Sequence, residues 1–173
     1  MKQQAKSVIA LDMDGTVLNF GKHTTETRSN DALLPLLPPR GHARIAILTN
    51  QGGMAFSRNN PAKYPTPERV AERIYAAVRF LREAGYPVEI IMASCYHPRA
   101  EHVAIQSAAA NLRGYMPQFG AKLWRVYTTE RARKPHPLML RAAGATVYYG
   151  DSPEDAQAAV AAGIPFVAMP RFE

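Results

Sequence analysis

Short apolar runs alternate with helical patterns along most of this chain, and this alternation limits the fold more than any other feature. Strands that are separated by helices form βα units, and such units build a parallel sheet with helices packed against it. The pattern therefore predicts an α/β fold around a central parallel sheet. The expected strands cover residues 7–11, 44–48, 88–92, 146–149 and 164–168, residues 121–127 offer a further strand, and the expected helices cover 66–85, 99–112, 137–143 and 152–163.

The length of 173 residues and the composition, 47% hydrophobic and 20% charged, predict a single globular domain over residues 1–173. The lone cysteine, Cys95, excludes an internal disulfide and favours a reducing, cytoplasmic compartment. The apolar run 8–11 is too short for a signal peptide, and no run reaches the length of a membrane span. We therefore expect neither a targeting segment nor a membrane partner.

Polar side chains follow three of the predicted strands at the point where each strand ends. Asp12 ends the first run, the pair Thr49-Asn50 follows the second, and Asp151 follows the fourth. Because ligands of an open parallel sheet bind beyond the carboxyl ends of its strands, these side chains are expected to converge. Asp14 follows Asp12 with a single residue between them, and two carboxylates so close need a positive charge nearby. The pair Arg133-Lys134, just before a predicted helix, is the candidate source of that charge.

Four ordered segments carry a resemblance to a known family. They read DMDGT at 12–16, LTNQGG at 48–53, RKPHPLML at 133–140 and GDSPEDAQAAVAAG at 150–163. In this order they resemble the motifs of the haloacid dehalogenase (HAD) superfamily of phosphohydrolases. The TNQ and RKPHP details are most similar to the subgroup of D,D-heptose bisphosphate phosphatases, histidinol phosphatases and polynucleotide 3′-phosphatases. The resemblance implies a Rossmann-like HAD fold with a small flap within 17–28. Only the segments before residue 44 and between residues 51 and 133 offer room for more, and the latter already contains a predicted helix and strand, so no large cap domain is expected.

The resemblance also implies a Mg²⁺-dependent phosphomonoester hydrolase that acts through an aspartyl-phosphate intermediate. Asp12 would attack phosphorus, and Asp14 would protonate the departing alkoxide and later deprotonate the attacking water. Magnesium prefers oxygen ligands, which aspartates provide. The implied site comprises the catalytic residues Asp12, Asp14, Thr49 and Lys134, the substrate-binding residues Asn50, Gln51, Arg133 and Ser152, and the metal ligands Asp12, Asp14, Asp151 and Asp155.

Several of these residues also have purely structural interpretations. A Thr49-Asn50 pair after a strand is often a turn or helix cap, and Lys134 could be a surface lysine before a proline. Ser152 and Asp155 have the spacing of a capping box, so Asp155 either reaches the metal or its water shell, or only caps its helix. For the whole protein, a phospho-accepting receiver domain and an inactive binding module are the non-enzyme alternatives.

A departure from the subgroup concerns zinc. Residues 95–98, CYHP, resemble the opening half of the zinc loop of the heptose phosphatases, but residues 130–134, ERARK, lack the closing thiols. With one thiolate, zinc would need His102 or His136 as substitute ligands, so zinc is not expected. A basic insert at about 99–130 replaces the loop.

The distribution of charge bears on the substrate. The formal net charge is +7, and residues 99–141 hold eight Lys or Arg against Glu101 and Glu130. A small phosphorylated substrate such as a sugar phosphate is the leading expectation. Because an extended basic surface attracts polyanions, a 3′-phosphorylated end of DNA or RNA is the alternative. A solvated face is the structural interpretation of the same charges, and the sequence predicts no oligomeric state.

Overall fold

The computed structural model describes residues 6–19 and 26–170, and its centre is a six-stranded sheet in the order β4-β3-β2-β1-β5-β6. Every neighbouring pair of strands is parallel, so the α/β, Rossmann-like fold predicted from the sequence is confirmed. All five expected strands form, and residues 121–127 contain a sixth at one edge of the sheet. The strands are β1 (Ser7–Asp12), β2 (Ala43–Asn50), β3 (Val88–Ser94), β4 (Leu123–Tyr127), β5 (Ala145–Gly150) and β6 (Phe166–Ala168).

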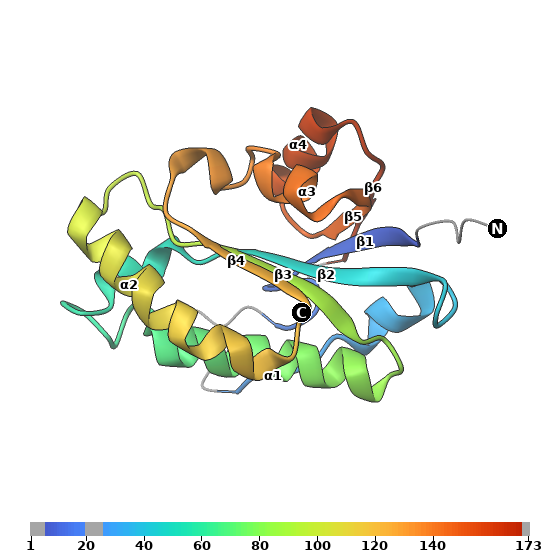
Figure 1. The fold of residues 1–173 in the computed structure, drawn as a ribbon, viewed down its shortest axis with the longest axis horizontal. Coiled ribbons are helices and arrows are strands. Elements are labelled where there is room, and N and C mark those ends of the chain that lie inside the picture. The colour runs from blue at the N-terminus through green and yellow to red at the C-terminus, as the bar shows by residue number, and fades with distance from the viewer. Residues whose placement is uncertain (1–5, 20–25, 171–173) are drawn as a thin grey trace.

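Four α-helices cover the two faces of the sheet. Figure 1 shows α3 and α4 on one side of the sheet and α1 and α2 on the other. The second helix starts three residues later than predicted, because Glu101 still has extended backbone as its N-cap and residues 97–100 form a turn. The helices are α1 (Pro67–Glu83), α2 (His102–Tyr115), α3 (Leu138–Ala143) and α4 (Pro153–Ala162), and short 3₁₀ helices lie at Asp31–Leu36, Gly52–Phe56, Met116–Phe119 and Glu130–Ala132.

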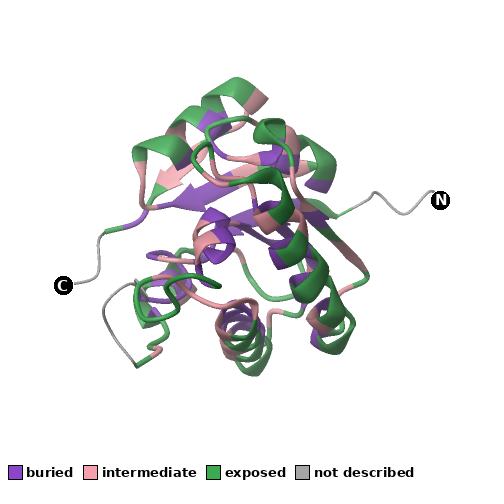
Figure 2. Ribbon diagram, turned by 90° about the vertical axis from the view of Figure 1, so that its left-hand side faces the viewer, coloured by how far each residue is buried: buried purple, intermediate pink, exposed green. Residues whose placement is uncertain are grey.

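The sheet separates two hydrophobic cores. Successive side chains of a strand point to opposite faces, so Ile9 packs with Ile74 of α1, whereas its neighbour Ala10 packs with Leu140 of α3. Figure 2 shows the strands as mostly buried and the helices as exposed on their outer sides. The buried apolar area drives these layers together, and it leaves the carboxyl ends of the strands to carry polar groups.

The segment after β1 forms part of the predicted flap. Leu18 pairs in antiparallel fashion with Ser29, and Asn19 exchanges hydrogen bonds with Glu26 and Arg28. These contacts, which we call the hairpin neck, join residues 18–19 to residues 26–29, and residues 20–25 lie outside the described residues. Over 6–19 and 26–170 no inserted domain covers the sheet, in agreement with the absence of a large cap. In the same ranges, no helix combines the length and the apolar character that a membrane crossing requires.

Candidate active site

The two neighbouring acids at the end of β1 bind cations that come from opposite layers of the fold. Asp12 accepts a hydrogen bond from Nζ of Lys134 at 2.7 Å. Asp14 accepts bonds from Nη2 and Nε of Arg73, on α1, at 2.7 and 3.1 Å. The chain turns sharply between Met13 and Leu18, and Gly15 has a φ of 89° in this turn, a conformation that glycine adopts easily. Each acid therefore has its own counter-ion, although the two are one residue apart.

Lys134 is the centre of the first half of the site. Its side chain is 5% exposed, and its ammonium donates to Asp12, Asp155 and the hydroxyl of Tyr148, each at 2.7 Å. Tyr148 in turn donates to Oδ1 of Asp155 at 2.7 Å. Since an ammonium has three hydrogens, these three acceptors satisfy it completely. The cluster joins β1, β5, α4 and the loop before α3.

Asp155 is bound by protein groups at both of its carboxylate oxygens. Oδ1 accepts from Lys134 and Tyr148, and Oδ2 accepts from the hydroxyl of Ser152 at 2.8 Å and from the backbone of residues 151 and 152 at 3.3 Å. Ser152 and Asp155 form the capping box of α4 that their spacing indicated. Gly150 makes room for this contact, because an added Cβ there would lie 2.5 Å from Cβ of Asp155.

Buried charges perturb the acids and the base of this cluster. Burial raises the pKa of Asp12 well above its usual value, although Lys134 opposes the shift. Burial also raises the pKa of Asp151. For Lys134 burial acts to lower the pKa, but Asp12, Tyr148 and Asp155 outweigh it and raise it well above its usual value. Burial acts to raise the pKa of Asp155, yet the contact with Lys134 lowers it overall.

The cluster has the composition of a divalent cation site. Oxygens of Asp12, Asp151 and Asp155 lie within 4.8 Å of one another, and Lys134 is the ammonium among them. Three carboxylates against one ammonium leave an excess of negative charge in a buried position, which a divalent cation would balance. Because both oxygens of Asp155 already accept several hydrogen bonds, Asp12 and Asp151 are better suited to contact an ion directly.

The residues after β2 connect the two halves of the site. Gln51 donates from Nε2 to Oδ2 of Asp14 and to Oγ1 of Thr49, both at 2.8 Å. Thr49 is buried, and because its oxygen accepts from Gln51, its hydroxyl hydrogen can serve another acceptor. Asn50 donates to the carbonyl of Lys134 at 3.3 Å and accepts from its N–H at 3.1 Å, and thereby fixes the loop that carries the lysine.

Arg133 lies beside this loop and is half-buried. Its Nη1 donates to the carbonyl of Tyr96 at 3.0 Å, and burial lowers its pKa. Gly52 lies against the same carbonyl and the guanidinium so closely that a Cβ there would overlap both. The loops after β2 and β3 thus pack directly on Arg133. Arg133 and Ser152 were both predicted to bind substrate, and in the structure the hydroxyl of Ser152 caps α4.

Residues 95–98, which resemble the opening of a zinc loop, start in the hydrophobic core and continue beside it. Cys95 is fully buried, and burial raises the pKa of its thiol to about 12. His97 accepts the N–H of Arg99 at Nδ1 and packs edge-on against Phe56, with 4.8 Å between ring centroids. Within the described ranges, the aspartate cluster is the one group of three or more His, Cys, Asp or Glu residues placed to hold a metal. The expectation about zinc stays a prediction.

Sequence reasoning missed two residues of the site, Arg73 and Tyr148. Arg73 falls on the inner face of α1 between Val70 and Ala77, where a charged residue needs a buried partner. Tyr148 lies in a strand that is buried on both faces, where a phenol needs a hydrogen-bond acceptor. These positions were the available signals, but neither of them identifies the partner.

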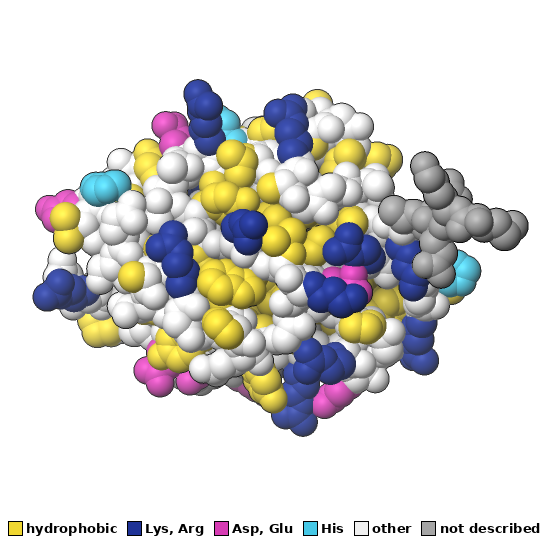
Figure 3. All heavy atoms as spheres, in the orientation of Figure 1, with side chains coloured by type: hydrophobic (Ala, Val, Ile, Leu, Met, Phe, Trp, Pro, Cys, Tyr) yellow, Lys and Arg dark blue, Asp and Glu magenta, His cyan; other side chains and the backbone are white. Residues whose placement is uncertain are grey.

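The basic residues of 99–141 are spread over several elements. Lys134 is internal, Lys122 pairs with Glu89, and Arg141 donates to the carbonyl of Ala161. Two further arginines donate to carbonyl groups of β4 itself. Figure 3 shows the Lys and Arg side chains on the face seen in Figure 1 as separate groups with hydrophobic and neutral surface between them. On this face the charges form no continuous patch.

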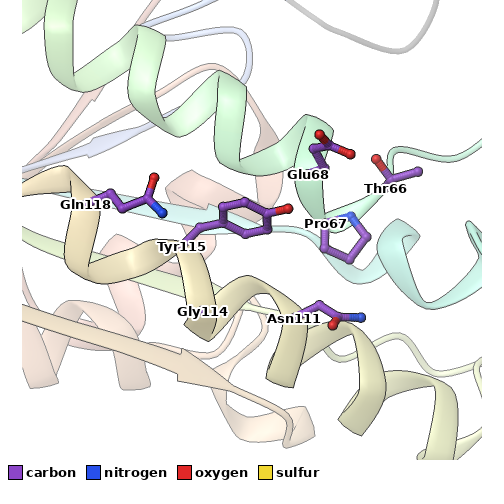
Figure 4. Close-up of a pocket in the computed structure, with 7 residues that line it drawn as sticks. All are labelled: Thr66, Pro67, Glu68, Asn111, Gly114, Tyr115 and Gln118. Atoms are coloured by element: carbon purple, nitrogen blue, oxygen red, sulfur yellow. The ribbon is translucent and has the colours of Figure 1, made fainter.

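A pocket of about 460 Å³ lies between the start of α1 and the end of α2. Figure 4 shows the ring of Tyr115 pointing from α2 toward Pro67. The lining of this pocket contains one charged residue, Glu68, and none of the clustered aspartates. We therefore place the reactive site at the carboxyl end of the sheet. The pocket is lined by Thr66, Pro67, Glu68, Asn111, Gly114, Tyr115 and Gln118.

Comparisons with known proteins give a likeness at the level of structure. No protein-family profile matches the sequence, and no curated protein sequence matches it. Among solved structures, the chain is similar to a HAD-superfamily hydrolase, subfamily IA, variant 1, from Geobacter sulfurreducens PCA, with 16% identity and a TM-score of 0.39. The likeness covers 96% of this chain and 93% of that one.

Proposed function

We propose that this chain is a Mg²⁺-dependent phosphomonoester hydrolase of the HAD type that acts through an aspartyl-phosphate. The observation that carries the proposal is the cluster in which Lys134 holds Asp12 beside Asp151, with Asp14 directed to a separate cation. Phosphoryl transfer to aspartate needs a carboxylate at the end of a strand, an ammonium beside it and a second carboxylate two positions further along the chain. The ordered sequence motifs support the same chemistry.

In the first step an oxygen of Asp12 attacks phosphorus while the bond from phosphorus to the ester oxygen breaks. Asp14 gives its proton to that departing oxygen, so the alcohol leaves neutral and Asp12 carries the phosphoryl group. In the second step water attacks phosphorus and gives a proton to Asp14. The bond from phosphorus to Asp12 breaks, inorganic phosphate leaves and both carboxyl groups return to their starting states.

Asp12, Asp151 and the backbone carbonyl of Asp14 would hold the Mg²⁺. When bound, the ion neutralises negative charge on the phosphoryl oxygens and on the carboxylates around it. The three aspartate oxygens that lie within 4.8 Å of one another, with a single ammonium among them, support this assignment. Asp155 would act beside the ion by fixing Lys134, since its own oxygens are occupied by hydrogen bonds.

Thr49 would donate a hydrogen bond to the transferring phosphoryl group, and Lys134 would stabilise it through its charge. The hydroxyl hydrogen of Thr49 is oriented by the bond that its oxygen accepts from Gln51. The ammonium of Lys134 offsets the charge that spreads over the phosphoryl oxygens in the transition state. Asn50 would contribute by fixing the lysine loop, and Arg133 offers a second cation at the rim.

The substrate we propose is a small phosphorylated metabolite such as a sugar phosphate. On the face shown in Figure 3 the basic side chains form separate groups, so this face offers no continuous track for a long polyanion. A 3′-phosphorylated nucleic-acid end is the alternative, and it predicts a steep dependence on salt through counterion release. Measuring kcat/KM for a sugar phosphate and a 3′-phosphorylated oligonucleotide at two salt concentrations separates the two classes.

The test of the reaction is phosphate release from p-nitrophenyl phosphate with Mg²⁺. We expect turnover that EDTA abolishes, loss of at least about 10³-fold in Asp12→Asn, and little change in the surface control Asp31→Asn. Calorimetric titration should detect Mg²⁺ binding to the wild-type chain and a large loss of affinity in Asp151→Asn. A chain that takes up phosphate slowly from acetyl phosphate without turnover would instead be a receiver, and one that does neither would be a binding module.

A further inference from the structure

Arg73 is a buried arginine whose hydrogen bonds all lead to one corner of the site. It is 4% exposed and lies on α1, about two turns from the start of the helix. Its Nε and Nη2 both donate to Oδ1 of Asp14, and Nη2 also donates to the carbonyl of Asn19. Its Nη1 lies 3.4 Å from Oγ1 of Thr27. The guanidinium thus joins Asp14 to both sides of the hairpin neck.

The two oxygens of Asp14 are engaged unequally. Oδ1 accepts two hydrogens from Arg73, which occupies both of its lone pairs. Among the residues that the structure describes, Oδ2 accepts one hydrogen, from Nε2 of Gln51 at 2.8 Å. One lone pair of Oδ2 is therefore available for a proton, whereas Oδ1 has no room for one.

We propose that Arg73 is a positioning residue that selects Oδ2 of Asp14 as the oxygen that exchanges protons with substrate and water. The inference rests on the proposed hydrolase function, because it assigns the proton path of that reaction. The proton that Oδ2 gives to the ester oxygen as the P–O bond breaks is replaced by one from water in the second step. Arg73 exchanges no proton itself and acts by fixing the carboxylate plane and its rotation.

The geometry requires arginine at this position. A guanidinium is planar and offers several N–H groups in a fixed fork, so it can hold one carboxylate oxygen with two donors and still reach the carbonyl of Asn19. A lysine has the charge but no fixed fork, so it would leave Asp14 freer to rotate. Charge alone is therefore expected to restore only part of the effect.

The experiment is a double-mutant cycle between Arg73→Met and Asp14→Asn, read with two substrates. An alkyl phosphate needs protonation of its poor leaving group, whereas p-nitrophenyl phosphate needs it much less. Because general acid catalysis contributes about 10²–10⁴-fold, we expect Arg73→Met to lower kcat for the alkyl phosphate by about 10²-fold and for p-nitrophenyl phosphate by less than about 10-fold. In the Asp14→Asn background the same change should have little further effect on either.

Two variants control for structural damage. Arg79 is an exposed arginine on the same helix, and it pairs with Glu83. Arg79→Met should leave both activities unchanged. Arg73→Lys should recover part of the alkyl phosphatase activity in a chain whose melting temperature is near that of the wild type. If Arg73→Met does not fold, Arg73→Lys takes its place in the cycle and must show the same selective loss.

The outcomes separate the two proposals. Equal losses for both substrates, or losses that multiply in full in the Asp14→Asn background, would show that Arg73 only stabilises the fold and would overturn the inference while hydrolysis stands. A wild-type chain that hydrolyses neither substrate rejects the hydrolase function and the inference with it. A wild type that hydrolyses the alkyl phosphate, with an Asp14→Asn variant that hydrolyses it equally fast, rejects the acid role that the inference needs.

Discussion

Replacing Lys134 by methionine tests the charge balance of the buried cluster. Methionine has a similar length and is apolar, so the change removes the ammonium with little change in volume. Asp12 and Asp155 each lose a bond of 2.7 Å to Nζ, and Tyr148 loses the donor to its hydroxyl oxygen. The variant therefore leaves two buried carboxylates without the cation that they share.

The magnitude follows from the burial of both partners. Lys134 and Asp155 are almost fully buried, and removal of one partner from a buried pair costs about 3–5 kcal/mol. For a chain of this length each 1 kcal/mol shifts the melting temperature by about 2–4 °C. A loss of about 3–5 kcal/mol should therefore lower the melting temperature by roughly 6–20 °C. We expect the variant to lose hydrolysis as well.

The loss should depend on pH with a definite sign. Without Lys134 the pKa of Asp12 rises further, because burial already raises it and the lysine is the group that opposes the shift. The unfolded chain ionises this carboxyl above its usual pKa of 3.8, whereas the folded variant retains the proton. The variant should therefore lose stability relative to the wild type as the pH rises, because its folded state keeps the proton on Asp12 over a wider pH range than the folded wild type does.

Urea unfolding in the presence of EDTA measures the effect without a contribution from divalent cations. Lys122→Met is the matched control, because Lys122 pairs with Glu89 on the surface and its side chain is 75% exposed. A surface pair contributes at most about 1 kcal/mol. If Lys134→Met loses no more stability than this control, or loses less at pH 8 than at pH 5, the assignment of a buried charge cluster is wrong.

Three further predictions concern single contacts. Tyr148→Phe should lower the free energy of unfolding by about 1.5–3 kcal/mol, because the buried hydroxyl bonds charged groups on both sides; an unchanged urea midpoint would contradict this. Cys95 should resist the thiol reagent DTNB at pH 8 in the native chain and react at once in urea, because burial raises the pKa of the thiol to about 12; equal rates would place the thiol at the surface. The double change Arg113→Ala and Arg125→Ala should increase self-association in sedimentation experiments, because the two guanidiniums donate to outward carbonyl groups of the edge strand β4; sedimentation like that of the wild type at every concentration would count against this role.

Much of the fold could be read from local patterns. Alternation and strand ends predicted five strands and the helices within a few residues, and Ser152 with Asp155 indicated the cap of α4 that the structure confirms. The start of β6 was predicted at residue 164 and lies at Phe166, because Gly163 ends α4 and the two following residues connect it to the strand. Such patterns depend on neighbours within a few positions, so sequence alone contains the information.

The sequence by itself determined which side chains end the strands, and parallel pairing of those strands brings them to one edge. It indicated Asp12, Asp151 and Lys134 as partners because the motifs occur in order. Only the tertiary structure decided how the charges pair. Lys134 meets Asp12 across 122 positions of sequence and Arg73 meets Asp14 across 59. The packing of α1 and α3 on opposite faces of the sheet sets these distances, so two acids separated by one residue bind two cations that no local pattern connects.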